Sequence, residues 1–274
     1  MTSSAVASSV GGIVTPKCAH ATLSDAKMAH CMCACDVWGG TFMNRMLCAL
    51  AFGANLLASP AALADQAVSV GGAMALLNKP ATPSASLILI PGGDGHLGVN
   101  VDGSFSGLRD NQLVRTRKAY LAHGVATLTI DSGVNVAEAV AYMRKVARPV
   151  VVAGTSRGTL RVPSALAGKP DGIVLTAGFL DQVKSAIGSP GSLPRTLIVH
   201  HRQDGCRFTP PSAVEPFRAW GGSRVRVAWM EGGLSSGDPC KARAHHGFNG
   251  LDRLVVSTVA QFAGKRRLKA ALRG

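Results

Sequence analysis

The segment VVVAGTSRG, residues Val150–Gly158, carries the clearest indication of a fold. Its first four residues are apolar and β-branched or small, which is typical of a short strand buried on both faces. They run directly into a Gly-x-Ser-x-Gly sequence centred on Ser156, and a stretch with helical spacing follows at 160–167. A strand, a sharp turn and a helix in this order lift a serine side chain clear of the sheet edge, and the glycines let the turn be tight. We therefore predict that Ser156 is a nucleophile.

A second Gly-x-Ser-x-Gly sequence occurs at Gly233–Gly237 and centres on Ser235. It lies in a segment rich in Gly, Ser and Pro, and no helical pattern follows it closely. Clusters of these residue types indicate a loop. We interpret Ser235 as a loop residue because it lacks the strand and the helix that give Ser156 its context.

The chain around Ser156 alternates short uncharged apolar runs with amphipathic stretches. Such an alternation predicts an α/β fold, with a mostly parallel central sheet and helices on both faces. Ligand sites in such folds lie at the carboxyl ends of the strands. We expect one or two strands within 68–77 and further strands at 87–90, 125–130, 150–153, 173–176, 197–200 and 225–230. We expect helices at 109–123, 136–146, 160–167, 214–220 and 251–262.

A serine hydroxyl becomes reactive when a neighbouring base takes its proton, and a carboxylate can orient that base. Asp204 follows the strand expected at 197–200, although an Asp-Gly pair can also be a plain turn. Downstream, Ala244–Phe248 reads AHHGF and offers two histidines. We expect one of the two, His245 or His246, to be the base.

Two backbone N–H groups are needed to hold the negative charge that develops on a carbonyl oxygen under attack. One is expected from Arg157, which follows the nucleophile. The other is expected from Gly93, with Asp94 as the alternative, in the sequence PGGDGH that follows the strand at 87–90. A plain glycine-rich turn is the other interpretation of that segment.

These segments, in this order, resemble the α/β-hydrolase superfamily over residues 70–265, and most nearly its small exported bacterial members of the dienelactone hydrolase type. That group often has a cysteine nucleophile, whereas this chain has a serine. The resemblance implies hydrolysis of an ester, thioester or amide through an acyl-enzyme, without a metal or organic cofactor. It also favours His246 over His245 as the base, because the family usually has a glycine or an aromatic residue soon after the base. About twenty residues separate the strands expected at 173–176 and 197–200. Many lipases have a helical lid at this position, and twenty residues are too few for a large lid domain.

The N-terminal part of the chain differs from the rest. Residues 43–64 contain Arg45, an apolar run at 46–57 and the sequence Ala62-Leu63-Ala64, in which two small residues flank a third residue. This pattern predicts a signal peptide cleaved after Ala64, and hence a periplasmic or secreted protein. We interpret residues 1–42 as an extension that is disordered or arises from a mis-assigned start codon. Residues 65–274 then form a single hydrolase domain without a transmembrane segment.

Cleavage after Ala64 would leave Cys206 and Cys240 as the two cysteines of the chain. In an oxidising compartment such a pair predicts one disulfide, and two buried thiols are the alternative. Cys206 lies two residues after Asp204, and Cys240 lies six before His246. If Asp204 and His246 meet, a disulfide would join their two loops.

The formal net charge of +14 is compatible with weak association with an anionic surface or with an ordinary basic protein. No nucleic-acid partner is expected, because the sequence contains no nucleic-acid-binding module and the aromatic content of 5% argues against a base-stacking platform. The leading hypothesis is a carboxylic-ester hydrolase with a small-molecule ester or acyl substrate. The alternatives are a peptidase or amidase on the same three residues, a binding protein that retains the fold, and a basic protein of the cell envelope.

Overall fold

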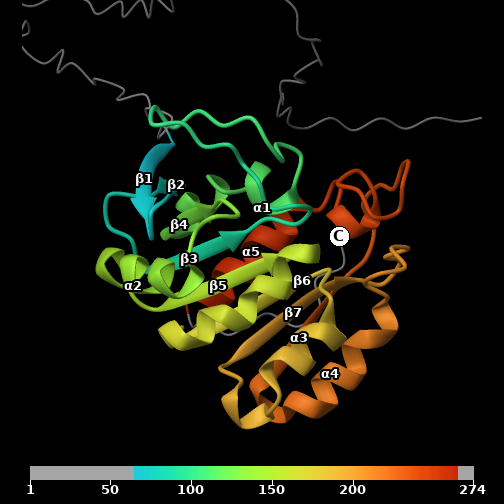
Figure 1. The fold of residues 1–274 in the computed structure, drawn as a ribbon. Helices are drawn as coiled ribbons and strands as arrows, with labels where there is room; N and C mark the ends of the chain where they lie inside the picture. The colour runs from blue at the N-terminus through green and yellow to red at the C-terminus, as the bar shows by residue number, and fades with distance from the viewer. Residues whose placement is uncertain (1–64, 265–274) are drawn as a thin grey trace, which may run out of the picture. The chain divides into compact units, whose positions relative to one another are not determined.

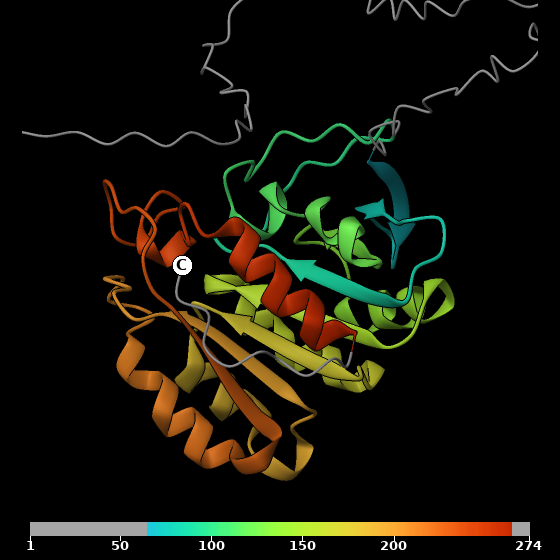
Figure 2. The same cartoon turned by 180° about the vertical axis from the view of Figure 1, so that it is seen from behind.

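A computed structural model describes residues 65–264. The predictions for residues 1–42, for a signal peptide at 43–64 and for cleavage after Ala64 lie outside the described residues. The described chain forms one eight-stranded sheet with helices on both faces (Figures 1 and 2). No helix within residues 65–264 has the length and apolar character that crossing a membrane requires.

The sheet has the strand order β1-β2-β4-β3-β5-β6-β7-β8. Its first strands, β1 (Gln66–Val70) and β2 (Ala73–Asn78), form an antiparallel pair, and β2 pairs antiparallel with β4. All other neighbours are parallel. The remaining strands are β3 (Ala85–Ile90), β4 (Val125–Ile130), β5 (Val150–Thr155), β6 (Gly172–Thr176), β7 (Thr196–His201) and β8 (Val225–Met230).

Two apolar cores lie on the two faces of the sheet. One face packs against α2 (Val136–Val146), the 3₁₀ helix η2 (Ser156–Gly168), α3 (Leu180–Ile187) and α4 (Val214–Gly221). The other face packs against α1 (Gln112–Arg115), η1 (Ala119–His123) and α5 (Asp252–Ala263). Figure 2 shows α5 crossing in front of the sheet. Strands β3 to β7 are buried along their whole length. This burial explains why each of them appears in the sequence as a run without charged residues.

The position of β3 determines where a site can form. It pairs with β4 on one side and with β5 on the other, so the connections after β3 and β5 diverge at one end of the sheet. In open α/β sheets such a point creates a crevice at the carboxyl ends of the strands. The segment Pro91–Gly95 and the turn at Ser156 begin at this end.

The prediction of one continuous helix at 109–123 is wrong. The structure has the single turn α1 and the separate 3₁₀ helix η1. The side chain of Asn111 accepts a hydrogen bond at the start of α1, and the hydroxyl of Thr116 donates to the carbonyl of Gln112 at its end. Such local side-chain bonds favour helix ends over helix interiors.

Two further elements differ from the prediction. The segment around Pro163 is a 3₁₀ helix rather than an α-helix, and Pro163 lacks the backbone N–H that the interior of an α-helix requires. The helix expected at 251–262 is observed as α5 (Asp252–Ala263), and the histidine segment before it forms a separate 3₁₀ turn, η6 (His245–Gly247). Helix α3 was not predicted.

Candidate active site

Ser156 lies at a strained turn between β5 and η2. Its φ is 50°, in the left-handed region that residues with a side chain rarely adopt. Strain of this kind persists where the surrounding structure fixes it, and it is common at functional sites. Here β5 fixes the residues before Ser156, and η2 fixes those after it.

The two glycines of the Gly-x-Ser-x-Gly sequence are required by close backbone approaches. A Cβ at Gly154 would lie 2.8 Å from a methyl carbon of Val162, and one at Gly158 would collide with the carbonyl oxygens of Ile90 and Pro91. Neither residue has a positive φ, so the requirement is for space rather than for an unusual backbone conformation. The start of η2 therefore packs directly on the end of β3.

The three residues predicted as nucleophile, base and acid lie in one chain of hydrogen bonds. His246 Nε2 is 3.0 Å from Ser156 Oγ, and His246 Nδ1 is 2.9 Å from Asp204 Oδ2. An ionised carboxylate only accepts, so Nδ1 carries the imidazole hydrogen. Nε2 is then free of hydrogen and accepts the bond from the Ser156 hydroxyl.

The alternatives to Ser156 and His246 lie in other surroundings. The ring of His245 stacks on that of His201 at a centroid distance of 4.2 Å, and its Nδ1 faces the carbonyl of Gln203 at 3.3 Å. Ser235 lies on an exposed loop, where its hydroxyl accepts a long bond of 3.4 Å from the N–H of His245. The geometry therefore favours Ser156 and His246.

Asp204 is a buried carboxylate with several hydrogen-bond donors. Oδ1 accepts from the N–H of Cys206 at 2.9 Å, and Oδ2 accepts from the hydroxyl of Thr209 at 3.2 Å. The fully buried His200 has its Nε2 3.0 Å from the carbonyl of Thr209 and 3.4 Å from Asp204 Oδ2. Since both of these oxygens accept, the hydrogen of His200 is on Nε2.

These contacts set the ionisation of Asp204. Burial opposes the charged form, but the hydrogen bonds from His200 and His246 outweigh it and hold the pKa of Asp204 well below the usual range. A carboxylate that stays charged can fix the tautomer of His246 and stabilise the imidazolium form.

The glycine loop after β3 borders the nucleophile. Gly92 and Gly93 line the same cavity as Ser156, and a Cβ at Gly92 would lie 3.0 Å from Ser156 Cβ. Gly93 has a φ of 67°, which suits glycine. The carboxylate of Asp94 accepts from the backbone N–H of His96 at 3.0 Å. Of the two candidates in this loop, Gly93 is therefore the one that lines the cavity.

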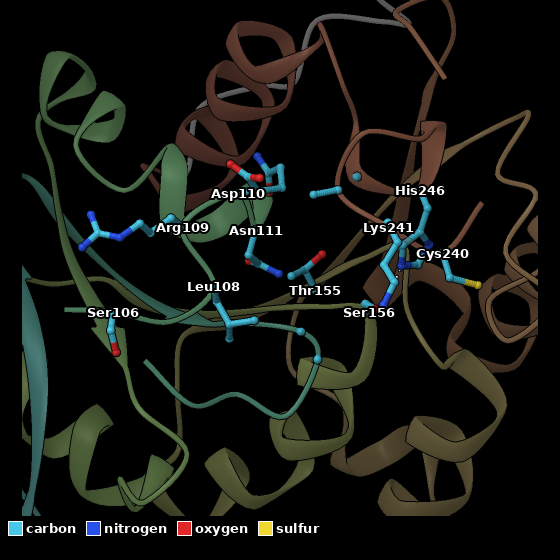
Figure 3. A pocket seen from close by; sticks show the side chains of 15 residues that line it. Ser106, Leu108, Arg109, Asp110, Asn111, Thr155, Ser156, Cys240, Lys241 and His246 are labelled. Atoms are coloured by element: carbon cyan, nitrogen blue, oxygen red, sulfur yellow. Dashed lines mark hydrogen bonds between the residues drawn. The ribbon is translucent and has the colours of Figure 1, made fainter. Parts of the chain in front are cut away.

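The cavity beside Ser156 has a volume of about 570 Å³. Its walls come from the loop after β3, from the start of α1, and from the segment that carries Cys240 and His246 (Figure 3). A volume of this size can hold a small organic molecule. The structure has α3 and the 3₁₀ turn η3 (Pro190–Ser192) between β6 and β7, and residues 65–264 contain no large lid.

Two connections hold the histidine segment in place. Cys206 and Cys240 form a disulfide, which joins it to the Asp204 loop. Arg115 donates to the carbonyl of Gly247 at 2.7 Å and forms two bonds, of 2.9 and 2.8 Å, with the carboxylate of Asp252. Arg115 therefore links α1, η6 and α5 next to His246.

Sequence reasoning did not find His200, Thr209, Asn111 or Arg115 as parts of the site. Asn111 carried a usable signal, since Asn directly before an apolar stretch is a common helix cap. The other three, His200, Thr209 and Arg115, reach the site through contacts with residues that are not their neighbours in the sequence pattern. A pattern along the chain does not reveal that Thr209 folds back between Asp204 and His246.

Searches with the sequence found no matching family model and no matching curated protein. Solved structures are similar. A dienelactone hydrolase from Anabaena variabilis is 16% identical, with 73% of this chain and 94% of that chain covered and a TM-score of 0.52. The esterase domain of a Rhodothermus marinus protein is 11% identical, with 73% and 96% covered and a TM-score of 0.52.

An alpha-beta serine hydrolase homologue from Coxiella burnetii is 17% identical, with 72% and 96% covered and a TM-score of 0.50. The chain has the α/β-hydrolase fold. The mostly parallel sheet with helices on both faces, as predicted from the sequence, is confirmed. Within the hydrolase fold, the catalytic roles of Ser156, Asp204 and His246 stay predictions that rest on their geometry.

Proposed function

We propose that this protein is a serine hydrolase that cleaves a small carboxylic ester through an acyl-enzyme. The observation that carries the proposal is the hydrogen-bonded chain from Ser156 through His246 to Asp204 at the edge of a cavity of about 570 Å³. A fold alone does not define a reaction, whereas a nucleophile, a base and an oriented acid in contact do narrow it.

In the first half of the proposed reaction, Ser156 Oγ attacks the ester carbonyl carbon while its proton passes to His246 Nε2. The backbone N–H groups of Gly93 and Arg157 hold the carbonyl oxygen as it becomes negative. The C–O bond to the alcohol then breaks, and His246 gives its proton to the departing alkoxide. Asp204 stays ionised and stabilises the imidazolium between these steps.

In the second half, water attacks the acyl-enzyme. His246 takes a proton from the water and returns it to Ser156 Oγ as the acyl–serine bond breaks. The products are one carboxylic acid and one alcohol, so each turnover consumes one water and restores the starting protonation of the site. The chain around the site is exposed, and the connection between β6 and β7 is short. Both features are compatible with a small substrate that is dissolved in water.

The test is hydrolysis of p-nitrophenyl esters with short acyl chains by residues 65–274, with Ser156→Ala compared with Ser235→Ala. We expect Ser156→Ala to lose at least about 10³-fold in kcat/KM. Ser235→Ala is the matched control and should keep the wild-type rate. Hydrolysis of matched p-nitroanilides alone would assign a peptidase or amidase instead. An inactive wild type that also fails to react with a fluorophosphonate would support the binding-protein alternative.

We also propose that the protein is exported, to the periplasm or beyond. The Cys206–Cys240 disulfide supports this proposal, because such bonds persist in oxidising compartments. The signal peptide predicted at 43–64 supports it independently from the sequence. Weak association with anionic surfaces, inferred from the net charge, stays a prediction.

A further inference from the structure

Asn111 has its side-chain amide in a fixed orientation beside the nucleophile. It is the residue before α1, and its Oδ1 accepts a hydrogen bond from the N–H of Leu113 at 3.2 Å. A backbone N–H can bond only the oxygen of the amide, so this contact decides which end of the side chain is oxygen. The NH₂ group must then face away from α1.

The NH₂ group borders the same small space as Ser156. A Cβ built on Gly92 would lie 3.4 Å from Asn111 Nδ2, 3.0 Å from Ser156 Cβ and 3.0 Å from the carbonyl oxygen of Thr155, so the NH₂ group lies close to the turn that carries Ser156. Asn111 also lines the cavity with Ser156, Gly92 and Gly93. Figure 3 shows its side chain pointing toward Thr155, the residue before Ser156.

We infer that Asn111 is a further catalytic residue, whose Nδ2–H group donates a hydrogen bond to the carbonyl oxygen of the bound acyl group. The inference rests on the proposed function. It adds a side-chain donor to the two backbone donors, Gly93 and Arg157. No proton is transferred by Asn111. Its hydrogen bond strengthens as the carbonyl electron pair moves onto oxygen, so it stabilises the transition state more than the bound ester.

The variants that test this role must keep the helix cap. Asn111→Ser and Asn111→Asp both retain a side-chain oxygen that can accept from the N–H of Leu113, and both remove the NH₂ group. Asn111→Asp also adds a negative charge next to the developing oxyanion. Asn135→Asp is the matched control, because Asn135 caps α2 through bonds to Ala137 and Glu138 and lies outside the cavity lining.

The experiment measures kcat and KM for p-nitrophenyl acetate, the rate of inactivation by a fluorophosphonate, and the melting temperature. We expect Asn111→Ser to lower kcat by roughly 10- to 100-fold with little change in KM, and Asn111→Asp to lower it further. Inactivation by the fluorophosphonate should slow in parallel, since the phosphoryl oxygen would occupy the same position. Asn135→Asp should keep the wild-type kcat.

Each other outcome overturns the inference in a distinct way. Folded Asn111 variants with wild-type kcat, or with a raised KM alone, would refute the catalytic role while the proposed function stands. Loss of folding in Asn111→Ser, together with wild-type kcat in a folded Asn111→Asp, would reduce Asn111 to a helix cap. A wild type that neither hydrolyses esters nor reacts with the fluorophosphonate would refute the proposed function and this role together.

Discussion

At the scale of single residues, the buried carboxylate of Asp204 controls the electrostatics of the site. It is only 5% exposed, and it receives hydrogen bonds from Cys206, Thr209 and His246, with His200 close by. A buried charge is costly unless its lone pairs are occupied. The surrounding donors occupy them, and the pKa of Asp204 is therefore lowered despite its burial.

This lowered pKa predicts how Asp204→Asn changes the pH dependence of stability. In the unfolded chain Asp204 takes up a proton near pH 3.9, whereas the folded protein keeps it charged to lower pH. Its contribution to the free energy of unfolding is thus present above about pH 4 and is lost as the pH falls below that value. Urea unfolding between pH 5 and 3 should show a steeper loss for the wild type than for Asp204→Asn, by up to about 1.4 kcal/mol per pH unit.

Asp181→Asn, at the exposed start of α3, is the control for this measurement, because it makes the same change from Asp to Asn outside the site. The same Asp204→Asn protein should lose about 10³- to 10⁴-fold in kcat, because an amide can favour the wrong tautomer of His246. Equal pH slopes for Asp204→Asn and the wild type would contradict the ionisation described here.

Ser156 and Asp204 could be predicted because each follows an apolar run, and His246 because Gly247 and Phe248 follow it. The residues that support these three carry a weaker signal in the sequence. His200 reads as the end of a strand, and Thr209 as an ordinary loop residue. Their contact with Asp204 depends on how the chain after β7 turns back, and that path is set by packing around His246 rather than by local pattern.

At the scale of elements, the close packing of η2 on the end of β3 brings the nucleophile and the glycine loop together. Gly158 makes this possible, since any side chain there would meet the carbonyl oxygens of Ile90 and Pro91. These are backbone atoms in and next to a central strand, so they can shift little. The spacing between Ser156 and Gly93 depends on this contact.

We predict that Gly158→Ala destabilises the protein by about 1–3 kcal/mol and lowers ester hydrolysis by more than its loss of folded protein explains. Gly191→Ala is the matched control, because a Cβ there would meet only the hydroxyl of Ser189 at 3.5 Å. Urea unfolding and kcat measured under folding conditions check the two effects separately. Wild-type values of both in Gly158→Ala would show that η2 can move without disturbing the site.

The elements themselves were predictable to different degrees. The strand at 125–130 and the helix at 136–146 were predicted at their observed bounds, because their burial and amphipathic patterns are unbroken. The segment 109–123 was not, since Asn111 and Thr116 cap a single turn within an otherwise helical pattern. Here short side-chain bonds to the backbone outweighed helical spacing.

At the scale of the whole molecule, the site depends on segments that are distant in the sequence. Ser156 and His246 are separated by 90 residues, and His246 and Asp204 by 42. The Cys206–Cys240 disulfide, with a sequence separation of 34, links the loops of Asp204 and His246 covalently. Closing a loop of this length restricts the unfolded chain and so stabilises the folded one.

Replacing both cysteines by serine should therefore lower the free energy of unfolding by about 3–4 kcal/mol. The disulfide lies at the cavity wall, so kcat should also fall in the folded double variant, as the histidine segment becomes less constrained. Urea unfolding measures the first effect, and intact mass with and without reduction before alkylation confirms the bond. Two thiols that alkylate without reduction in exported protein would refute the disulfide.

Covalent labelling shows whether Ser156 is an activated nucleophile. The protein is treated with a fluorophosphonate at neutral pH, digested, and the modified residue is located by peptide mass spectrometry. We predict a single adduct on Ser156, formed much more slowly in Asp204→Asn and absent in Ser156→Ala. An adduct on Ser235, or no adduct on a folded protein, would contradict it.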